Sequence, residues 1–82
     1  MKVRVRVTLK PSILDPQGKA IGNALTALGF SGVGEVRQGK IIEIELDETD
    51  PARVRQQAEA MCKQLLANPV TEDYAIETIA SG

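Results

Sequence analysis

The sequence predicts a single α+β domain, residues 1–82, with four strands and two helices in the order βαββαβ. Three observations support this expectation. The chain begins with a strictly alternating apolar pattern, and two later segments have apolar residues at helical spacing. Each of these two segments starts with the same dipeptide, Asp15-Pro16 and Asp50-Pro51. The repeated dipeptide indicates two βαβ halves.

The first strand is predicted over residues 2–9, and the first helix is predicted to begin at Asp15-Pro16. Asp15 can cap the helix, and the missing N–H of Pro16 is harmless at the first helical position. Gly29 ends the helix in a left-handed conformation. The strand alternates Val3, Val5, Val7 and Leu9 with Lys2, Arg4, Arg6 and Thr8, and the helix carries an apolar stripe of Ala20, Ile21, Ala24, Leu25 and Leu28.

A second strand over residues 32–36 and a third over residues 40–47 are predicted to form a hairpin. A three-residue loop, Arg37-Gln38-Gly39 with Gly39 left-handed, places Val36 on the apolar face of the third strand. A two-residue loop would place Glu35 there instead, so the three-residue loop is preferred. The apolar face of the third strand carries Ile42, Ile44 and Leu46, and its other face carries Ile41, Glu43 and Glu45.

The second helix is predicted to run from Asp50-Pro51 to Asn68-Pro69, because a residue before proline is disfavoured in the helical region. The last strand is predicted over residues 72–80, with Tyr74 and Ile76 on one face and Glu77 on the other. The apolar stripe of the second helix consists of Val54, Ala58, Met61, Cys62, Leu65 and Leu66.

This order of elements is that of the ferredoxin-like, split-βαβ fold, an antiparallel four-stranded sheet of order 4-1-3-2 with both helices on one face. The first and third strands are then neighbours, and the basic residues of the first lie opposite Glu43 and Glu45. Each such pair contributes about 0.2–1 kcal/mol. The uncovered face is predicted to be polar and charge-compensated, with Ile41 as an apolar exception.

Composition excludes several classes of function. The net charge of −1 and the pI of about 5.3 argue against nucleic-acid binding. One cysteine excludes an internal disulfide and a CxxC site, and no apolar run approaches the ~20 residues that span a bilayer. We therefore expect a cytoplasmic protein with no membrane contact. A chain of this length buries only about 60–65% of the surface of its unfolded form, so partner chains would add stability.

The residues offer little catalytic chemistry. The chain has no histidine, which removes the commonest general base and metal ligand. Cys62 lies in an apolar stripe, which favours a buried structural thiol. The glycine-rich segment 29–34 runs from helix to strand, whereas a phosphate loop runs from strand to helix. Phe30 and Tyr74 are too few for an RNA-stacking sheet. We expect no catalytic, cofactor or metal site.

The loop over residues 10–14 is longer than a strand–helix connection requires and holds two apolar residues, Ile13 and Leu14. These either fold back onto the helix or enter a neighbouring chain. The basic segment 37–40 is either a solubilising hairpin tip or a protrusion that docks on an acidic or phosphate-lined partner. The candidate interface residues are Lys10, Ile13, Leu14, Gln17, Arg37, Gly39 and Lys40.

Four segments stand out together: Val5-Arg6-Val7-Thr8-Leu9-Lys10-Pro11, Leu14-Asp15-Pro16-Gln17-Gly18, Ala27-Leu28-Gly29-Phe30 and Val36-Arg37-Gln38-Gly39-Lys40. In order and with matching spacing, they resemble the PurS family, the small accessory subunits of formylglycinamidine ribonucleotide synthase. The likeness spans essentially the whole chain. The Gly-rich segment 31–34 departs from the family, whose members often carry bulkier or acidic residues there.

The resemblance implies a non-catalytic subunit in purine biosynthesis. It would assemble with a PurL-type synthase, on which ATP and Mg²⁺ are expected, and with a PurQ-type glutaminase that releases ammonia. It would bridge these subunits, support ammonia transfer and form a homodimer or homotetramer. The candidate interface residues would then be contact surface.

Two other functions share the βαββαβ plan. An ACT-type regulatory module would bind an amino acid or nucleotide at a dimer interface. An acylphosphatase-like enzyme needs an arginine in an anion-binding loop between the first strand and the first helix, and the loop over residues 10–14 contains none.

Overall fold

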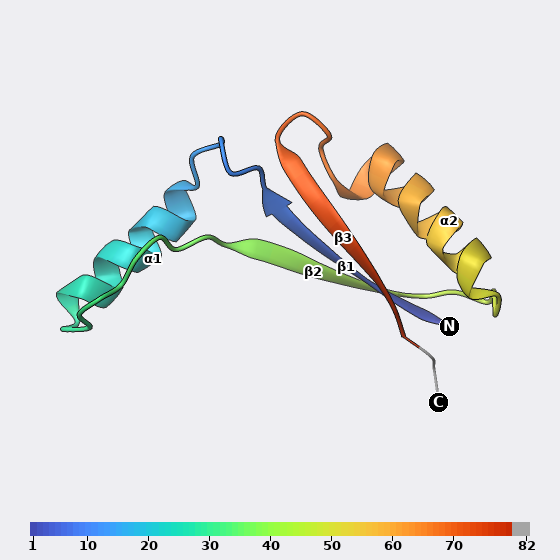
Figure 1. Cartoon of the computed structure of the whole chain (residues 1–82), viewed down its shortest axis with the longest axis horizontal. Helices are drawn as coiled ribbons and strands as arrows, with labels where there is room; N and C mark the ends of the chain where they lie inside the picture. Colours follow the sequence, from blue (N-terminus) through green and yellow to red (C-terminus); the bar gives the residue numbers. More distant parts are fainter. Residues whose placement is uncertain (80–82) are drawn as a thin grey trace.

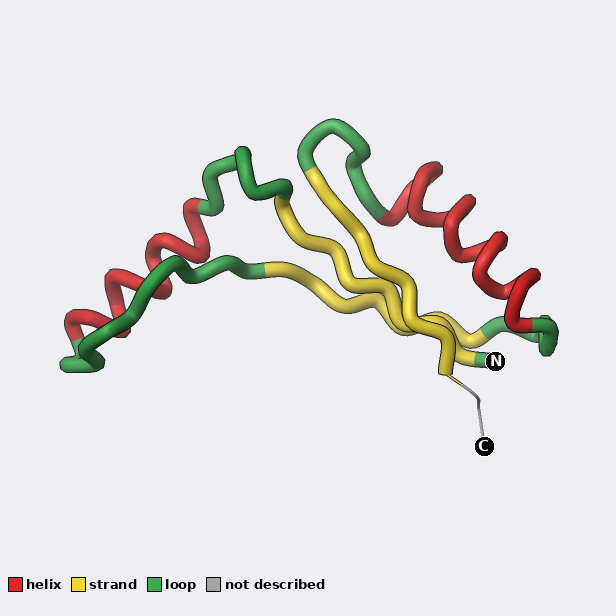
Figure 2. Tube along the Cα trace, in the orientation of Figure 1, coloured by secondary structure: helices red, strands yellow, loops and turns green. Residues whose placement is uncertain are grey.

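The computed structural model describes residues 1–79 (Figures 1 and 2). Ala80, where the predicted last strand ends, lies outside the described residues. The elements are β1 (Lys2–Leu9), α1 (Pro16–Ala27), β2 (Gly39–Glu45), α2 (Pro51–Met61), the π-helical turn η1 (Cys62–Leu66) and β3 (Glu72–Ile79).

Over the described residues the sheet has three strands in the order β2-β1-β3, and both pairs are antiparallel. The predicted central position of the first strand is confirmed. Val5 of β1 lies opposite Ile42 of β2 and Ile76 of β3, so the apolar residues of all three strands share one face.

The other face of the sheet is charged, as predicted. The guanidinium of Arg4 lies 3.2 Å from a carboxylate oxygen of Glu43 and 3.8 Å from one of Glu77. Lys2 adds a longer pair of 4.0 Å with Glu43. Ile41 is exposed on this face, as expected. These ion pairs are open to solvent and contribute modestly to stability.

The hydrophobic core lies between β1 and the helix formed by α2 and η1. It consists of Val3, Val5, Val7, Val54, Ala58, Cys62 and Ala67. The Cys62 thiol is buried, as predicted, and burial, with a smaller effect of Glu59, raises its pKa. One stripe residue was placed wrongly: Leu65 is exposed, because the hydrogen bond from Ala67 N to Cys62 O spans five residues and widens the turn.

The predicted ferredoxin-like arrangement is not confirmed, because residues 32–36 are not part of the sheet and α1 does not cover it. The predicted hairpin turn is wrong. Gly39 is not left-handed; it lies within β2 opposite Thr8, where a Cβ would come within 2.7 Å of the Val7 oxygen. The chain therefore enters β2 without turning. Helix α1 and residues 28–38 extend beyond the end of the sheet instead (Figure 1).

The chain is consequently extended. Its radius of gyration is 16.2 Å, against about 12 Å for a compact domain of this length. Its accessible surface is 5816 Å², about 1,000 Å² more than the roughly 4,800 Å² of a compact monomer of its mass. A single copy of the chain therefore buries only part of its own apolar surface.

Adjacent residues of β1 provide a test of this core. Val5→Ala is expected to lower the free energy of unfolding by about 2 kcal/mol, because Val5 is fully buried. Arg4→Ala is the control, and it should cost less than about 1 kcal/mol because its ion pairs are exposed. Urea unfolding of both variants measures the difference, and equal losses would contradict the assignment of the two faces.

Candidate interaction surface

Helix α1 and the segment 28–36 that returns along it form a unit that we call the arm. Gly29, with a φ of 97°, ends the helix as predicted, and the chain then runs back along α1 (Figure 2). Val36 passes close to two helical glycines. A Cβ at Gly18 would overlap the Val36 carbonyl oxygen, and one at Gly22 would lie 3.4 Å from the Val36 side chain. The two glycines therefore let the return segment lie against the helix.

Asp15 joins both ends of the arm to each other. Its Oδ1 accepts a hydrogen bond of 2.8 Å from Gly18 N, which caps α1 ahead of Pro16 as predicted. Its Oδ2 accepts a second bond of 2.7 Å from Gln38 N, where the chain leaves the arm. The side chain is only 5% exposed, so these bonds are shielded from water.

The surroundings of Asp15 favour its charged form. The N–H of Gln38 and then that of Gly18 lower the pKa of the carboxyl below its ordinary value, and the Arg37 guanidinium acts in the same direction. Burial opposes them but is outweighed. The carboxylate is therefore ionised at neutral pH and accepts both bonds with full charge.

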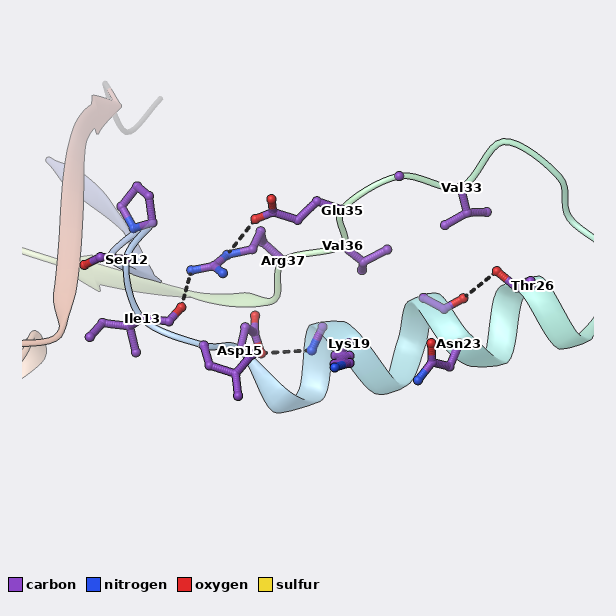
Figure 3. Close-up of a pocket in the computed structure, with 15 residues that line it drawn as sticks. Ser12, Ile13, Asp15, Lys19, Asn23, Thr26, Val33, Glu35, Val36 and Arg37 are labelled. Atoms are coloured by element: carbon purple, nitrogen blue, oxygen red, sulfur yellow. Dashed lines mark hydrogen bonds and ion pairs between the residues drawn. The ribbon is translucent and has the colours of Figure 1, made fainter.

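Arg37 ties the loop after β1 to the start of β2. Its Nη2 donates to the carbonyl oxygens of Lys10 at 2.8 Å and Ile13 at 3.0 Å, with a longer contact of 3.4 Å to Leu9. Its Nε lies 3.6 Å from Glu35 Oε1 (Figure 3). We use the name brace for this cluster, which consists of the Asp15 carboxylate, the Arg37 guanidinium and the backbone groups that donate hydrogen bonds to them or accept hydrogen bonds from them. The brace fixes where the arm leaves the sheet.

A cleft of about 540 Å³ lies between the loop, α1 and the return segment. Its charged residues are mixed in sign: Lys19 and Arg37 against Asp15 and Glu35 (Figure 3). Asp15 and Arg37 are already bound to the backbone, and no buried side-chain polar atom of the described residues lacks a partner. The two charged groups of the brace that line the cleft are therefore occupied by the chain's own backbone.

The arm exposes the apolar stripe that the sequence predicts to be buried. Leu28 is 75% exposed, Leu14 at the arm's base is 71% exposed, and Ile21 and Phe30 are exposed as well. Only Leu25 of the stripe's larger residues is half-buried. A monomeric protein rarely leaves so many large apolar side chains on one short element uncovered.

After Phe30, the backbone N–H groups of the return segment are unpaired within the described residues. Residues 33–37 follow the bend at Gly32, and within the described residues none of the N–H groups of residues 31–37 donates a hydrogen bond. The segment continues directly into β2, whose outer edge has no neighbouring strand among the described residues. Unpaired backbone along one extended ribbon is a template for pairing with another strand.

The structure places the predicted interface residues in three groups. Lys10, Ile13 and Arg37 meet at the brace, with the Lys10 ammonium 2.7 Å from Asp73 Oδ1. Leu14 and Gln17 are exposed at the base of the arm. Gly39 and Lys40 lie in β2, not at a hairpin tip. Their contact roles remain a prediction.

Sequence reasoning missed two features of this surface, the second hydrogen bond of Asp15 and the close approach at Gly18. Asp15-Pro16 and Asp50-Pro51 look equivalent in sequence, but Asp50 caps only its own helix, through Ala52 N at 3.0 Å. A glycine in the first turn of a helix was the one available signal, because glycine is unfavourable there unless a neighbour needs the space.

The described part of the chain contains neither a cluster of metal-binding side chains nor a membrane-spanning helix. Within residues 1–79 no three His, Cys, Asp or Glu side chains lie close enough to hold a metal ion. None of the helices in that range is long and apolar enough to cross a membrane.

Comparison with known proteins gives a consistent result. Residues 2–80 match the family model described as PurS, phosphoribosylformylglycinamidine (FGAM) synthase. The PurS subunit of this synthase from Synechocystis is 51% identical over 77 residues, which cover 94% of this chain and 77% of that protein.

Solved structures that are similar to this chain agree with the family match. The crystal structure of Methanocaldococcus jannaschii PurS has a TM-score of 0.85 and 45% identity, covering 93% of this chain and 92% of that one. A chain in the structure of PurLQS from Thermotoga maritima also has a TM-score of 0.85, at 28% identity, covering 93% of each chain.

The two helical glycines give a matched test of the arm. Gly18→Ala should destabilise the protein by about 1–3 kcal/mol, because the new methyl group overlaps the Val36 carbonyl. Gly22→Ala should be neutral or stabilise by up to about 1 kcal/mol, since alanine favours a helix and the nearest side chain is 3.4 Å away. Thermal unfolding of both variants measures this, and a harmless Gly18→Ala would contradict the close packing.

Because Asp15 is ionised in the folded protein, we expect the stability of the fold to depend on pH in the acid range. Its folded pKa lies below the ordinary value of 3.8, so its contribution to stability is complete above that pH and is lost as the pH falls through the folded pKa. Unfolding measured between pH 5 and pH 2 should therefore show a smaller decline for Asp15→Asn than for the unmodified chain. Identical pH profiles would show that Asp15 has no depressed pKa.

Proposed function

Because the chain belongs to the PurS family of phosphoribosylformylglycinamidine synthase subunits, we propose that it is the non-catalytic assembly subunit of that enzyme in purine biosynthesis. It bridges a PurQ-type glutaminase and a PurL-type ATP-dependent synthase and supports the transfer of ammonia between them. The similarity to a chain of the T. maritima PurLQS structure supports association with these two partners. The ACT-type alternative has no comparable support.

The chemistry of the chain supports a non-catalytic role. The sequence contains no histidine, and its one cysteine is a buried thiol with a raised pKa. Hydrolysis of glutamine and use of ATP are therefore assigned to the partner subunits, with ATP and Mg²⁺ on the synthase. This chain contributes surface and geometry.

The observation that carries the proposal is the uncovered arm. The excess accessible surface of about 1,000 Å² resembles the roughly 800 Å² that each partner buries in a stable protein interface. The arm also exposes an apolar stripe and an unpaired backbone, which supply the two means by which chains associate. The chain therefore exposes more surface suited to association than a compact domain of its mass would.

A second copy of the chain is the first partner that fits. Residues 33–38 lead directly into β2, and two such ribbons can pair antiparallel about a two-fold axis near residue 38. Residues 32–36 of each copy then lie beside β2 of the other, and each α1 covers the other copy's sheet. Each sheet gains the fourth strand that the sequence predicts. We propose that the homodimer forms by this exchange.

The proposal is tested by reconstitution. Adding the chain to purified glutaminase and synthase subunits should raise glutamine-dependent synthesis of the amidine, while ammonia-dependent synthesis changes much less. Absence of both a complex and stimulation would contradict the proposal.

Leu14→Asp tests the contact surface within this assay. Leu14 is exposed in the isolated chain, so the variant should weaken assembly at least tenfold while the melting temperature falls by no more than a few degrees. Ser12→Asp, which adds the same charge two residues away, is the control. Equal losses of thermal stability and of assembly in Leu14→Asp would show that Leu14 supports the fold and not a contact.

A further inference from the structure

We propose that the brace determines how the chain assembles: Asp15 and Arg37 hold the arm away from its own sheet and so direct it to a second copy. This inference rests on the exchange proposed above. It assigns the choice between a closed monomer and an exchanged dimer to two side chains at the hinge.

The closed alternative is well defined. In it, residues 37–39 turn, residues 32–36 pair with β2 of the same chain and α1 packs on the same sheet. An exchanged dimer makes these same contacts between copies, and only the hinge differs. The contacts of strands and helix therefore contribute almost equally to both forms. The hinge decides between them, together with the concentration of the protein.

The hydrogen bonds of the brace require an extended hinge. Asp15 Oδ2 accepts from Gln38 N at 2.7 Å, and Arg37 reaches the carbonyl oxygens of Lys10 and Ile13 at 2.8 and 3.0 Å. A turn at residues 37–39 would reorient the N–H of Gln38 and carry the guanidinium away from the loop. Gly39 would also leave its place opposite Thr8. Closing therefore breaks several charge-assisted hydrogen bonds that the open form retains.

The chain contains a matched control for Asp15. Asp50 precedes Pro51 and caps α2 through Ala52 N, but the structure gives its carboxylate no bond to a hinge segment. Serine is itself a good helix cap and has one side-chain oxygen. Asp15→Ser therefore keeps the cap and loses the bond to Gln38, whereas Asp50→Ser keeps everything that concerns the arm.

Arg37 has a control of the same kind. Arg53 lies 3.8 Å from Glu48 and 3.9 Å from Asp50, and its side chain is 71% exposed. The side chain of Arg37 is 29% exposed and binds backbone carbonyls on both sides of a loop. Glutamine at either position removes the charge and shortens the side chain, but only Arg37→Gln removes a hinge contact.

The experiment compares the full chain with these four single variants. Light scattering measures the mass over a wide range of concentration, and hydrogen exchange measures protection of the amides of residues 31–36. The unmodified chain, Asp50→Ser and Arg53→Gln should share one dimer dissociation constant within about twofold. Asp15→Ser and Arg37→Gln should raise it at least tenfold and give monomers in which residues 31–36 are protected, as in the closed hairpin.

Each other outcome overturns a stated claim. If Asp15→Ser and Arg37→Gln dimerise as tightly as the controls, the brace does not direct assembly, although the exchange itself stands. If they become monomers whose residues 31–36 exchange freely, the brace only keeps the arm folded, and the inference is wrong. If the unmodified chain is monomeric at every concentration, the exchange is wrong and the inference falls with it.

Discussion

The hydrogen bonds between Asp15 and the two ends of the arm are the interaction on which the rest of the structure depends. Asp15 is the one buried charged residue among those that the structure describes, and its two oxygens serve two different segments. One bond starts α1 and the other fixes the backbone just before β2. Arg37 adds hydrogen bonds to two carbonyl oxygens of the loop after β1. These hydrogen bonds join the arm to the loop after β1 and to the segment before β2, and we propose that they set the direction of the arm.

The chain is divided into a part that is complete and a part that is not. Strands β1 and β3 and helix α2 enclose a core of small apolar side chains. Most of the larger apolar residues of the arm are left uncovered by the described part of the chain. The two βαβ halves have the same local signals, yet only the half that contains α2 buries its apolar stripe within the chain. In the exchanged dimer that we propose, association would complete the fold as well as build a complex, and stability and assembly would be linked.

The sequence predicted the features that short-range chemistry controls. Both helix starts, the left-handed Gly29, the core of β1 and the charged outer face of the sheet follow from alternation, capping and helical spacing. It could not predict the direction of the arm, because residues 32–36 have the same pattern whether they pair within one chain or with another. The turn at Gly39 failed for the same reason, since a glycine suits both a left-handed turn and the close approach to Val7. Leu65 was misplaced because apolar spacing does not reveal a π-helical turn.

The unpaired segment 31–37 also bears on the lifetime of the protein in the cell. Proteases bind their substrates as extended strands, and this segment is largely exposed and free of backbone hydrogen bonds from its own N–H groups. A single copy thus presents a cleavage site without having to unfold, whereas the exchanged dimer that we propose would cover it. Degradation would then remove unpaired copies selectively and spare the dimer.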